Sequence, residues 1–241
     1  MISIIIPSLN EEKYLPLLLE SIKKQNFGVP FGSYEIIVAD AGSKDKTLEI
    51  AKNNNCLVVA GGLPGKARNE GAKVAKGNIL FFVDSDIKLP DNFFEKVLLE
   101  FNNKKIDIAS FCLKTYPENK FTDFILDFLY NRSIILLERI LPHAAMGILI
   151  KKDLFEKING FDETITLAED MDFARRASKI GKFRIIRSVF IYSSDRRVKK
   201  DGWFKTLVKF FLCEIHMIFI GPVRNNSGIF EHKFGHYKDQ K

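Results

Sequence analysis

Short apolar runs alternate with helical patterns along the first 90 residues. Runs of strand length, rich in Ile, Val and Phe, occupy residues 2–7, 35–40, 56–60 and 79–84. Helix-like stretches separate them at residues 11–24, 45–54 and 66–76, and Gly77 follows as a candidate left-handed end to the last of these. Strands that alternate with helices are typical of a parallel sheet covered on both faces. The pattern therefore predicts an α/β fold.

The pattern is less regular after residue 90. It predicts helices at residues 91–101 and 168–180 and strands at 106–112, 146–150 and 183–192. Apolar residues from Phe121 to Leu129 follow the i, i+3, i+4, i+7, i+8 spacing of a helix with one apolar face. We expect one domain over residues 1–198, with halves 1–90 and 91–198. Residues 199–241 then form a basic amphipathic extension.

Polar clusters follow several of the apolar runs. They occupy residues 7–11, 40–43, 65–69 and 84–86. In open parallel sheets, ligands bind beyond the carboxyl ends of the strands, so these clusters are the candidate site. Asp84 and Asp86 flank Ser85 directly after a strand, where both carboxylates can face a hard divalent cation. Taken alone, the triplet fits a strand-end turn that caps the helix after Pro90 better than it fits a metal site.

Charge is distributed unevenly along the chain. Residues 173–241 carry a net charge of +11, whereas residues 1–172 carry −4. This tail contains an apolar helical stripe, which includes Trp203, Phe204, Leu207, Val208, Phe211, Ile215 and Phe219. A basic helix of this kind suits a lipid interface. Core packing and a homodimer face are the alternatives. Phosphates or an anionic membrane are the expected partners, and nucleic acid is not.

The cysteines and the N-terminal segment indicate which cellular compartment to expect for the protein. Cys56, Cys112 and Cys213 are far apart and odd in number, so neither a disulfide framework nor a Cys-x-x-Cys site is predicted. The chain starts on a strand-like segment without the basic region of a signal peptide. A cytoplasmic enzyme, peripheral at the inner face of the membrane, is the expectation.

The order and spacing of these segments resemble the nucleotide-binding half of family 2 glycosyltransferases of the GT-A fold. The segments that carry the resemblance are residues 5–12, 38–45, 67–71 and 82–86, continued by 159–163 and 169–173. The resemblance spans roughly residues 1–198. It implies a Rossmann-like, mainly parallel sheet flanked by helices. It also implies an inverting hexosyltransferase that moves a sugar from a UDP- or GDP-type donor to an acceptor. The acceptor group is a hydroxyl or a phosphate, and lipid-linked acceptors are among those implied.

The resemblance also implies roles for individual residues. The donor-binding residues it indicates are Pro7, Asn10, Glu11, Asp40, Lys66, Arg68 and Asp84. Asp86 resembles the main ligand of a Mn²⁺ or Mg²⁺ ion, with Asp84 beside it. Asp170, next to Glu169, is similar to the family's catalytic base. Asp40 equally fits a turn-closing residue, and acids at a helix start also complement its dipole.

Three features separate this chain from the commonest family pattern or add to it. Ala41 stands where a second Asp is usual, and Lys88 stands where some lipid-linked members have Gln near the metal. Arg196 and Arg197 follow an apolar strand and are candidates to clamp the diphosphate, because guanidinium matches phosphate geometry. A basic surface patch is the equal alternative for this pair.

Two other function classes remain as alternatives. A sugar-1-phosphate nucleotidyltransferase also binds nucleotides on an α/β sheet. Enzymes of that class resemble one another in a Gly-rich loop directly after the first strand. This chain has no glycine in residues 7–11. A non-catalytic nucleotide- or membrane-binding module is the third hypothesis, and the acids Asp86 and Asp170 argue against it.

Overall fold

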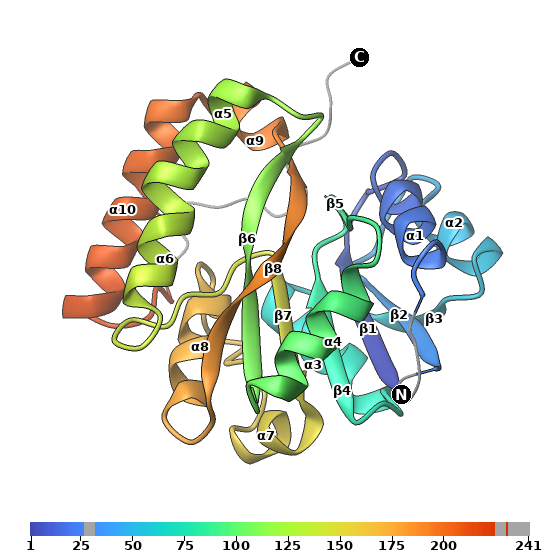
Figure 1. The fold of residues 1–241 in the computed structure, drawn as a ribbon. Helices are drawn as coiled ribbons and strands as arrows, with labels where there is room; N and C mark the ends of the chain where they lie inside the picture. The colour runs from blue at the N-terminus through green and yellow to red at the C-terminus, as the bar shows by residue number, and fades with distance from the viewer. Residues whose placement is uncertain (27–31, 225–229, 231–241) are drawn as a thin grey trace.

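The computed structural model describes residues 1–26, 32–224 and 230. Eight strands form one sheet in the order β3-β2-β1-β4-β7-β6-β8-β5 (Figure 1). The strands are β1 (Ile2–Ser8), β2 (Tyr34–Asp40), β3 (Leu57–Ala60), β4 (Ile79–Val83), β5 (Ile87–Lys88), β6 (Ile108–Tyr116), β7 (Gly147–Lys151) and β8 (Phe183–Ser194). The first four pair in parallel, and β7 is antiparallel to both β4 and β6. The predicted α/β class is confirmed.

Helices cover both faces of this sheet. They are α1 (Leu15–Lys23), α2 (Thr47–Asn53), α3 (Pro64–Val74), α4 (Phe93–Asn103), α5 (Lys120–Ile125), the π-helix η1 (Leu126–Asn131), α6 (Arg132–Leu137), α7 (Lys152–Lys157), α8 (Glu169–Ser178), α9 (Arg196–Asp201) and α10 (Trp203–Phe219). None of the helices in the described residues is long and apolar enough to cross a membrane.

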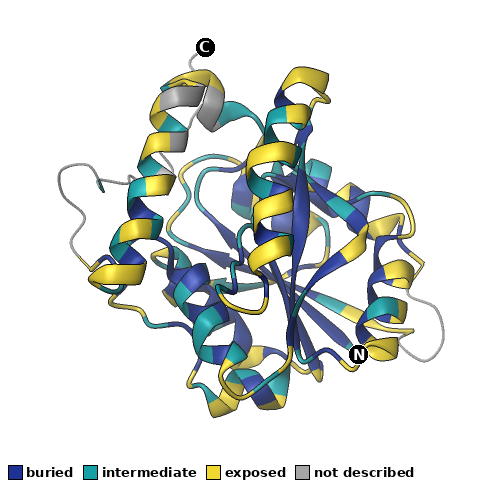
Figure 2. Cartoon of the chain, turned by 60° about the vertical axis from the view of Figure 1, so that its left-hand side comes forward, coloured by how far each residue is buried: buried dark blue, intermediate teal, exposed yellow. Residues whose placement is uncertain are grey.

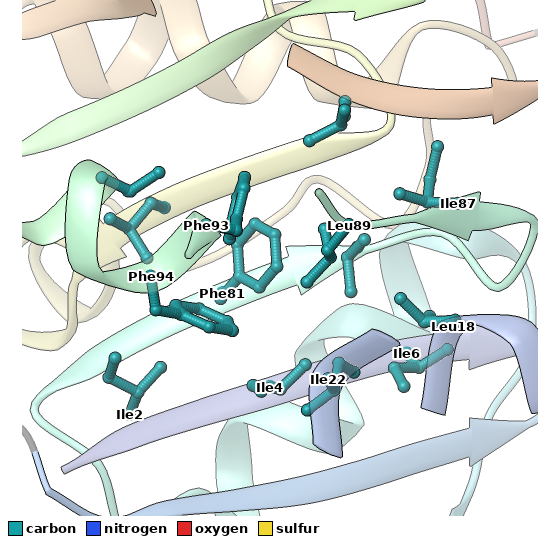
Figure 3. Packing of buried hydrophobic residues seen from close by; sticks show 14 of the residues in the cluster. Ile2, Ile4, Ile6, Leu18, Ile22, Phe81, Ile87, Leu89, Phe93 and Phe94 are labelled. Carbon is teal, nitrogen blue, oxygen red and sulfur yellow. The ribbon is translucent and has the colours of Figure 1, made fainter. Parts of the chain in front are cut away.

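The central strands β1 and β4 are buried on both faces, because successive side chains point to opposite sides and helices cover each side. Ile4 and Phe81 face one cluster, which α1 and α4 complete with Leu18 and Phe93 (Figure 3). Their neighbours Ile5 and Phe82 face a second cluster, which includes residues of α3, α7 and α8. Each residue of β1 and β4 is buried. This packing fixes the strand ends rigidly, and the candidate site lies there.

Two glycines allow close packing beside β1. A Cβ on Gly71 of α3 would lie 2.4 Å from Cγ2 of Ile5, so the helix lies almost directly on the strand. The prediction of a left-handed Gly77 was wrong, since this residue is not among those with positive φ. Its Cβ would lie 2.7 Å from both the backbone nitrogen and Oγ of Ser3. Gly77 is needed for that close approach, and α3 already ends at Val74.

The amphipathic helix predicted after residue 202 is present as α10 and packs partly as core. Cys213 and Met217 are buried against Leu167 and Met171 of the α8 region. Phe211, Ile218 and Phe219 remain exposed. Figure 2 shows buried and exposed segments alternating along this helix. The side chains of Arg197, Val198, Trp203, Phe204, Leu207 and Phe210 lie outside the described part of the chain. Core packing therefore accounts for one face of α10 and leaves another in solvent.

Candidate active site

The predicted strand-end residues meet in one cleft of about 920 Å³. Pro7, Asn10 and Glu11 reach it from the end of β1 and the loop beyond, and residues 84–86 come from the end of β4. Glu169 and Asp170 come from the start of α8, and Arg196 comes from the start of α9. Carboxylates from both halves of the sheet thus face a single space.

Arg68 of α3 joins the two halves of this site. Its Nη2 donates to Oδ1 of Asp84 at 2.8 Å, and its Nη1 donates to Oε1 of Glu169 at 2.5 Å. The guanidinium also lies over the ring of Phe161, 5.3 Å from its centroid. Burial lowers the pKa of Arg68, but the charges of Asp84 and Glu169 outweigh it and raise the pKa overall. Arg68 is therefore a permanently charged link between carboxylates that would otherwise repel.

Replacing Arg68 with Met is expected to lower the free energy of unfolding by about 3–5 kcal/mol, because it leaves buried carboxylates without their counter-charge. Urea unfolding of the variant beside the wild type measures this loss. Lys66→Met is the matched control on the same helix, since Lys66 is exposed. A loss below about 1 kcal/mol for Arg68→Met would contradict the linking role.

Arg196 makes the second charged cluster of the cleft. Its Nη1 and Nη2 donate to the two carboxylate oxygens of Glu11 at 2.8 and 2.7 Å. Its Nε lies 3.1 Å from Oδ2 of Asp86, which also accepts a hydrogen bond from Oγ of Ser194 at 2.9 Å. Burial raises the pKa of Glu11 to about 7, although Arg196 opposes the rise. Both aspartates of the triplet thus have an arginine partner.

The donor set of the triplet fits a hard divalent cation. Within the described residues, Oδ2 of Asp84 and Oδ1 of Asp86 accept no hydrogen bond. No group of three or more His, Cys, Asp or Glu side chains among these residues is arranged to hold a metal ion. Magnesium-type ions are commonly bound by one or two carboxylates together with substrate phosphates, so a pair of aspartates suffices.

Asp170 lies in the first turn of α8, after Ala168 in a left-handed conformation with φ of 61°. Its Oδ1 accepts the backbone N–H of Met171 at 2.9 Å, so it satisfies one free N–H group of the first turn, although the N-cap residue itself is Ala168. Burial, and then the neighbouring charge of Glu169, raises the pKa of Asp170 well above the ordinary range, while Arg68 opposes the rise. A carboxylate with a raised pKa is a stronger base once ionised. The helix-capping and catalytic interpretations are therefore compatible.

Two predicted donor-binding residues of the described chain, Asp40 and Lys66, do not line this cleft. Asp40 closes a turn, since its Oδ2 accepts the backbone N–H groups of Gly42 and Ser43 at 2.9 and 2.8 Å. It borders a separate shallow hollow beside β3. Lys66 is exposed on α3. The side chain of Arg197 lies outside the described residues.

Sequence reasoning missed a polar group in the cleft wall. Tyr130, His143 and Glu214 line the cleft, and Nη2 of Arg175 donates to Oε1 of Glu214 at 2.5 Å. Burial, with the charge of Arg175 adding to it, lowers the pKa of His143 to about 4, so this ring is neutral at physiological pH. The Tyr130 hydroxyl is buried without a hydrogen-bond partner in the described part of the chain. These residues come from separate segments of the chain, and no local spacing in the sequence connects them.

A protein-family model, Glycosyl transferase family 2, matches residues 3–167. The poly(ribitol-phosphate) β-N-acetylglucosaminyltransferase TarS of Staphylococcus aureus is 42% identical over 92 residues, or 35% of this chain and 16% of TarS. GlyG of Streptococcus pneumoniae, a glycosyltransferase, is 30% identical over 252 aligned positions, covering 89% of this chain and 79% of GlyG. GgaB of Bacillus subtilis, a minor teichoic acid biosynthesis protein, is 30% identical, with 83% of this chain and 23% of GgaB aligned. The sequence alignments with TarS and GgaB therefore cover under a quarter of either relative.

Solved structures share the fold. The mannosyltransferase PcManGT of Pyrobaculum calidifontis, in complex with GDP-Man and Mn²⁺, superposes with a TM-score of 0.70 at 17% identity. That match covers 90% of this chain and 63% of PcManGT. Residues 1–349 of S. aureus TarS, in complex with UDP-GlcNAc, superpose with a TM-score of 0.64 at 23% identity, covering 89% and 66% of the two chains.

Proposed function

This chain belongs to glycosyl transferase family 2, and from that premise we propose that it transfers a sugar from a nucleotide-sugar donor to an acceptor, with inversion at the sugar carbon. One observation carries the proposal. Two triplet aspartates from the first half of the sheet and Asp170 from the second face one cleft, with arginines between them. The site thus combines acids for a cation, a candidate base and cationic groups for phosphate.

The donor is assigned to the triplet side of the cleft. Asp86 and Asp84 would hold a Mn²⁺ or Mg²⁺ ion, which when bound neutralises the diphosphate that leaves. Pro7, Asn10 and Glu11 border the same space and are assigned to the nucleoside. Two structures that share the fold support a UDP or GDP donor, because TarS was solved with UDP-GlcNAc and PcManGT with GDP-Man.

Arg196 is assigned to the diphosphate. In the free protein its guanidinium is shared between Glu11 and Asp86. A diphosphate offers the same bidentate geometry with more charge, so the arginine exchanges carboxylate partners for phosphate partners as the donor enters. Asp86 then loses the guanidinium that competes for its oxygens.

Asp170 is assigned as the general base that takes the proton of the acceptor hydroxyl. The acceptor oxygen forms a bond to the sugar carbon from the face opposite the diphosphate, and the bond from that carbon to the diphosphate oxygen breaks. Asp170 takes the hydroxyl proton as the new bond forms. Arg68 and Glu169 keep the surrounding charge fixed, so no reorganisation is needed at that moment.

The test of this function is transfer of label from radioactive UDP- and GDP-sugars, with Mn²⁺ present, into the organic phase of a bacterial lipid extract and into added polyols. Incorporation that EDTA abolishes is the expected result. A protein that binds donor and metal yet releases no sugar to any acceptor or to water would favour the non-catalytic alternative. The nucleotidyltransferase alternative would instead release pyrophosphate from UTP or GTP.

A peripheral position at an anionic membrane is part of the proposal, supported by the charge of the tail and the exposed apolar residues of α10. Each Lys or Arg near such a surface contributes about 1 kcal/mol. Reversing two exposed lysines, with Lys199→Glu and Lys205→Glu together, is therefore expected to weaken binding to phosphatidylglycerol vesicles by about 30-fold or more at low salt. Co-sedimentation measures this, and high salt should weaken the wild type similarly. Wild-type protein that stays in the supernatant at low salt would contradict the membrane assignment.

A further inference from the structure

The helical segment from α5 to α6 is apolar on two faces. Leu126, Leu129 and Leu137 line the active-site cleft. Other large apolar side chains of this segment and the turn after it point to solvent: Phe121 is 70% exposed, Phe124 68%, Phe128 58%, Leu136 81% and Ile140 83%. A helix that is apolar around most of its circumference is normally buried. The outer face therefore requires a cover that the described chain does not supply.

Helix α10 forms the opposite wall of the same cleft. Val208 and Phe211 line the cleft, and α10 and α6 both lie on the same side of the molecule (Figure 1). Its outer residues Ile218 and Phe219 are 49% and 80% exposed. The exposed apolar side chains of the α5–α6 segment form one ridge beside the cleft, and those of α10 form a second ridge. Contiguous exposed apolar surface of this kind marks an interaction site.

The cleft itself changes character along its length. Its charged residues come from the strand ends and the first turns of α8 and α9, where Asp86, Asp170 and Arg196 lie. Its apolar lining comes from the α5–α6 segment and α10. A ligand that filled the whole cleft would need a polar head at Asp170 and an apolar chain between the helices.

Two features of the molecule favour a lipid surface as the cover of these apolar side chains. Segment 195–220 has six basic and three acidic residues, which complements anionic headgroups. A protein partner seated on both ridges would close the cleft over Asp170, whereas a bilayer on the ridges would supply molecules to it. Resting on the proposed function, we propose that the groove between the α5–α6 segment and α10 binds the apolar chain of a lipid acceptor.

Two adjacent leucines of α6 allow a matched test. Leu137 lines the cleft, whereas Leu136 is 81% exposed and does not. The probes are octyl, decyl and dodecyl phosphate below their micellar concentrations, titrated calorimetrically into the full chain. Affinity is expected to rise by up to about fourfold per added methylene, the factor for complete burial of a CH₂ group. The Leu137→Lys variant should bind dodecyl phosphate at least tenfold more weakly than the wild type. The Leu136→Lys variant should keep an affinity within twofold of the wild-type value.

Binding of the exposed apolar side chains of the α5–α6 segment to a lipid surface is tested with vesicles instead of alkyl phosphates. The double variant Phe124→Lys and Leu136→Lys should lose co-sedimentation with phosphatidylglycerol–phosphatidylcholine vesicles, while Leu137→Lys should retain most of it. Equal melting temperatures for wild type and variants establish that each is folded.

Three outcomes would overturn the proposal. Affinity independent of chain length excludes an apolar groove, and equal losses in Leu136→Lys and Leu137→Lys indicate adsorption to the outer surface. A dimer in sedimentation that Leu136→Lys dissociates would assign the ridges to a second copy of the chain. Binding of UDP and GDP with Mn²⁺ is measured on the same proteins. If it is absent throughout, the proposed function fails while the groove result stands on its own.

Discussion

Replacing Asp170 with Asn is expected to lower the rate of sugar transfer by a factor of about 10² to 10⁴, which is the usual contribution of a positioned general base. The amide keeps the size of the carboxylate and still accepts the backbone N–H of Met171 that Asp170 now accepts at 2.9 Å. Helix α8 and the donor side of the cleft should therefore be unchanged. Single-turnover rates and donor affinity, measured on the same variant, separate chemistry from binding.

The pH dependence provides a second readout of the same residue. Because burial and the charge of Glu169 raise the pKa of Asp170, its ionised form is lost at a higher pH than for an ordinary aspartate. Activity should thus rise with pH through that raised range and fall as Asp170 takes up its proton. The Asn variant should lack this limb. Near-normal turnover in Asp170→Asn would leave Asp170 only its helix-capping role.

Replacing Asp86 with Ala is expected to remove the contribution of the cation to nucleotide binding. In the variant, affinity for UDP or GDP in Mn²⁺ should approach the affinity in EDTA, because the one triplet carboxylate that remains, Asp84, is already paired with Arg68. The fold should persist, since Arg196 keeps both hydrogen bonds to Glu11. Calorimetric titration of nucleotide at fixed Mn²⁺ measures the change.

The matched control is Asp91→Ala, which removes an exposed carboxylate from the connection that follows β5. It should bind nucleotide like the wild type. Wild-type affinity in Asp86→Ala with Mn²⁺ present would remove the triplet from the metal assignment and leave Asp86 as the partner of Arg196 and Ser194 alone.

The strand ends could be predicted because their causes are local. Every residue of β1 and β4 is buried, so the polar residue that follows each strand is conspicuous in the sequence. Glu11 and Asp86 were found in this way, and both line the cleft. Their pairing with Arg196 could not be predicted, because 185 residues separate Arg196 from Glu11 and only the folded sheet brings them together.

The helical segment beside the cleft was predicted only in part. Its apolar spacing predicted a helix from Phe121 to Leu129, but the chain continues through the π-helix η1 into α6. Asn131 is the last residue of η1. In the structure its side chain is buried and pairs with the backbone of Leu113 on β6, accepting the N–H at 2.8 Å and donating to the oxygen at 3.0 Å. A tertiary contact thus satisfies the hydrogen-bonding groups of a side chain that local propensity favours at a helix end.

Asp40 illustrates the limit of residue-by-residue transfer. The resemblance implied a contact with the nucleobase, while the local alternative was a turn that closes at Gly42. The structure has the turn, with both backbone N–H groups bound by one carboxylate oxygen. Contact with a nucleobase stays a prediction, because the residue borders a hollow separate from the main cleft.

The most direct test of the central claim is the melting temperature of the wild-type chain with UDP-, GDP- and dTDP-sugars, each measured in Mn²⁺, in Mg²⁺ and in EDTA. A ligand that binds only the native state stabilises it, by about 2.7 kcal/mol at a concentration of 100 times Kd. The account predicts that at least one nucleotide-sugar raises the melting temperature with a divalent cation and raises it far less in EDTA. No shift with any donor in either cation would contradict a metal-dependent nucleotide-sugar site.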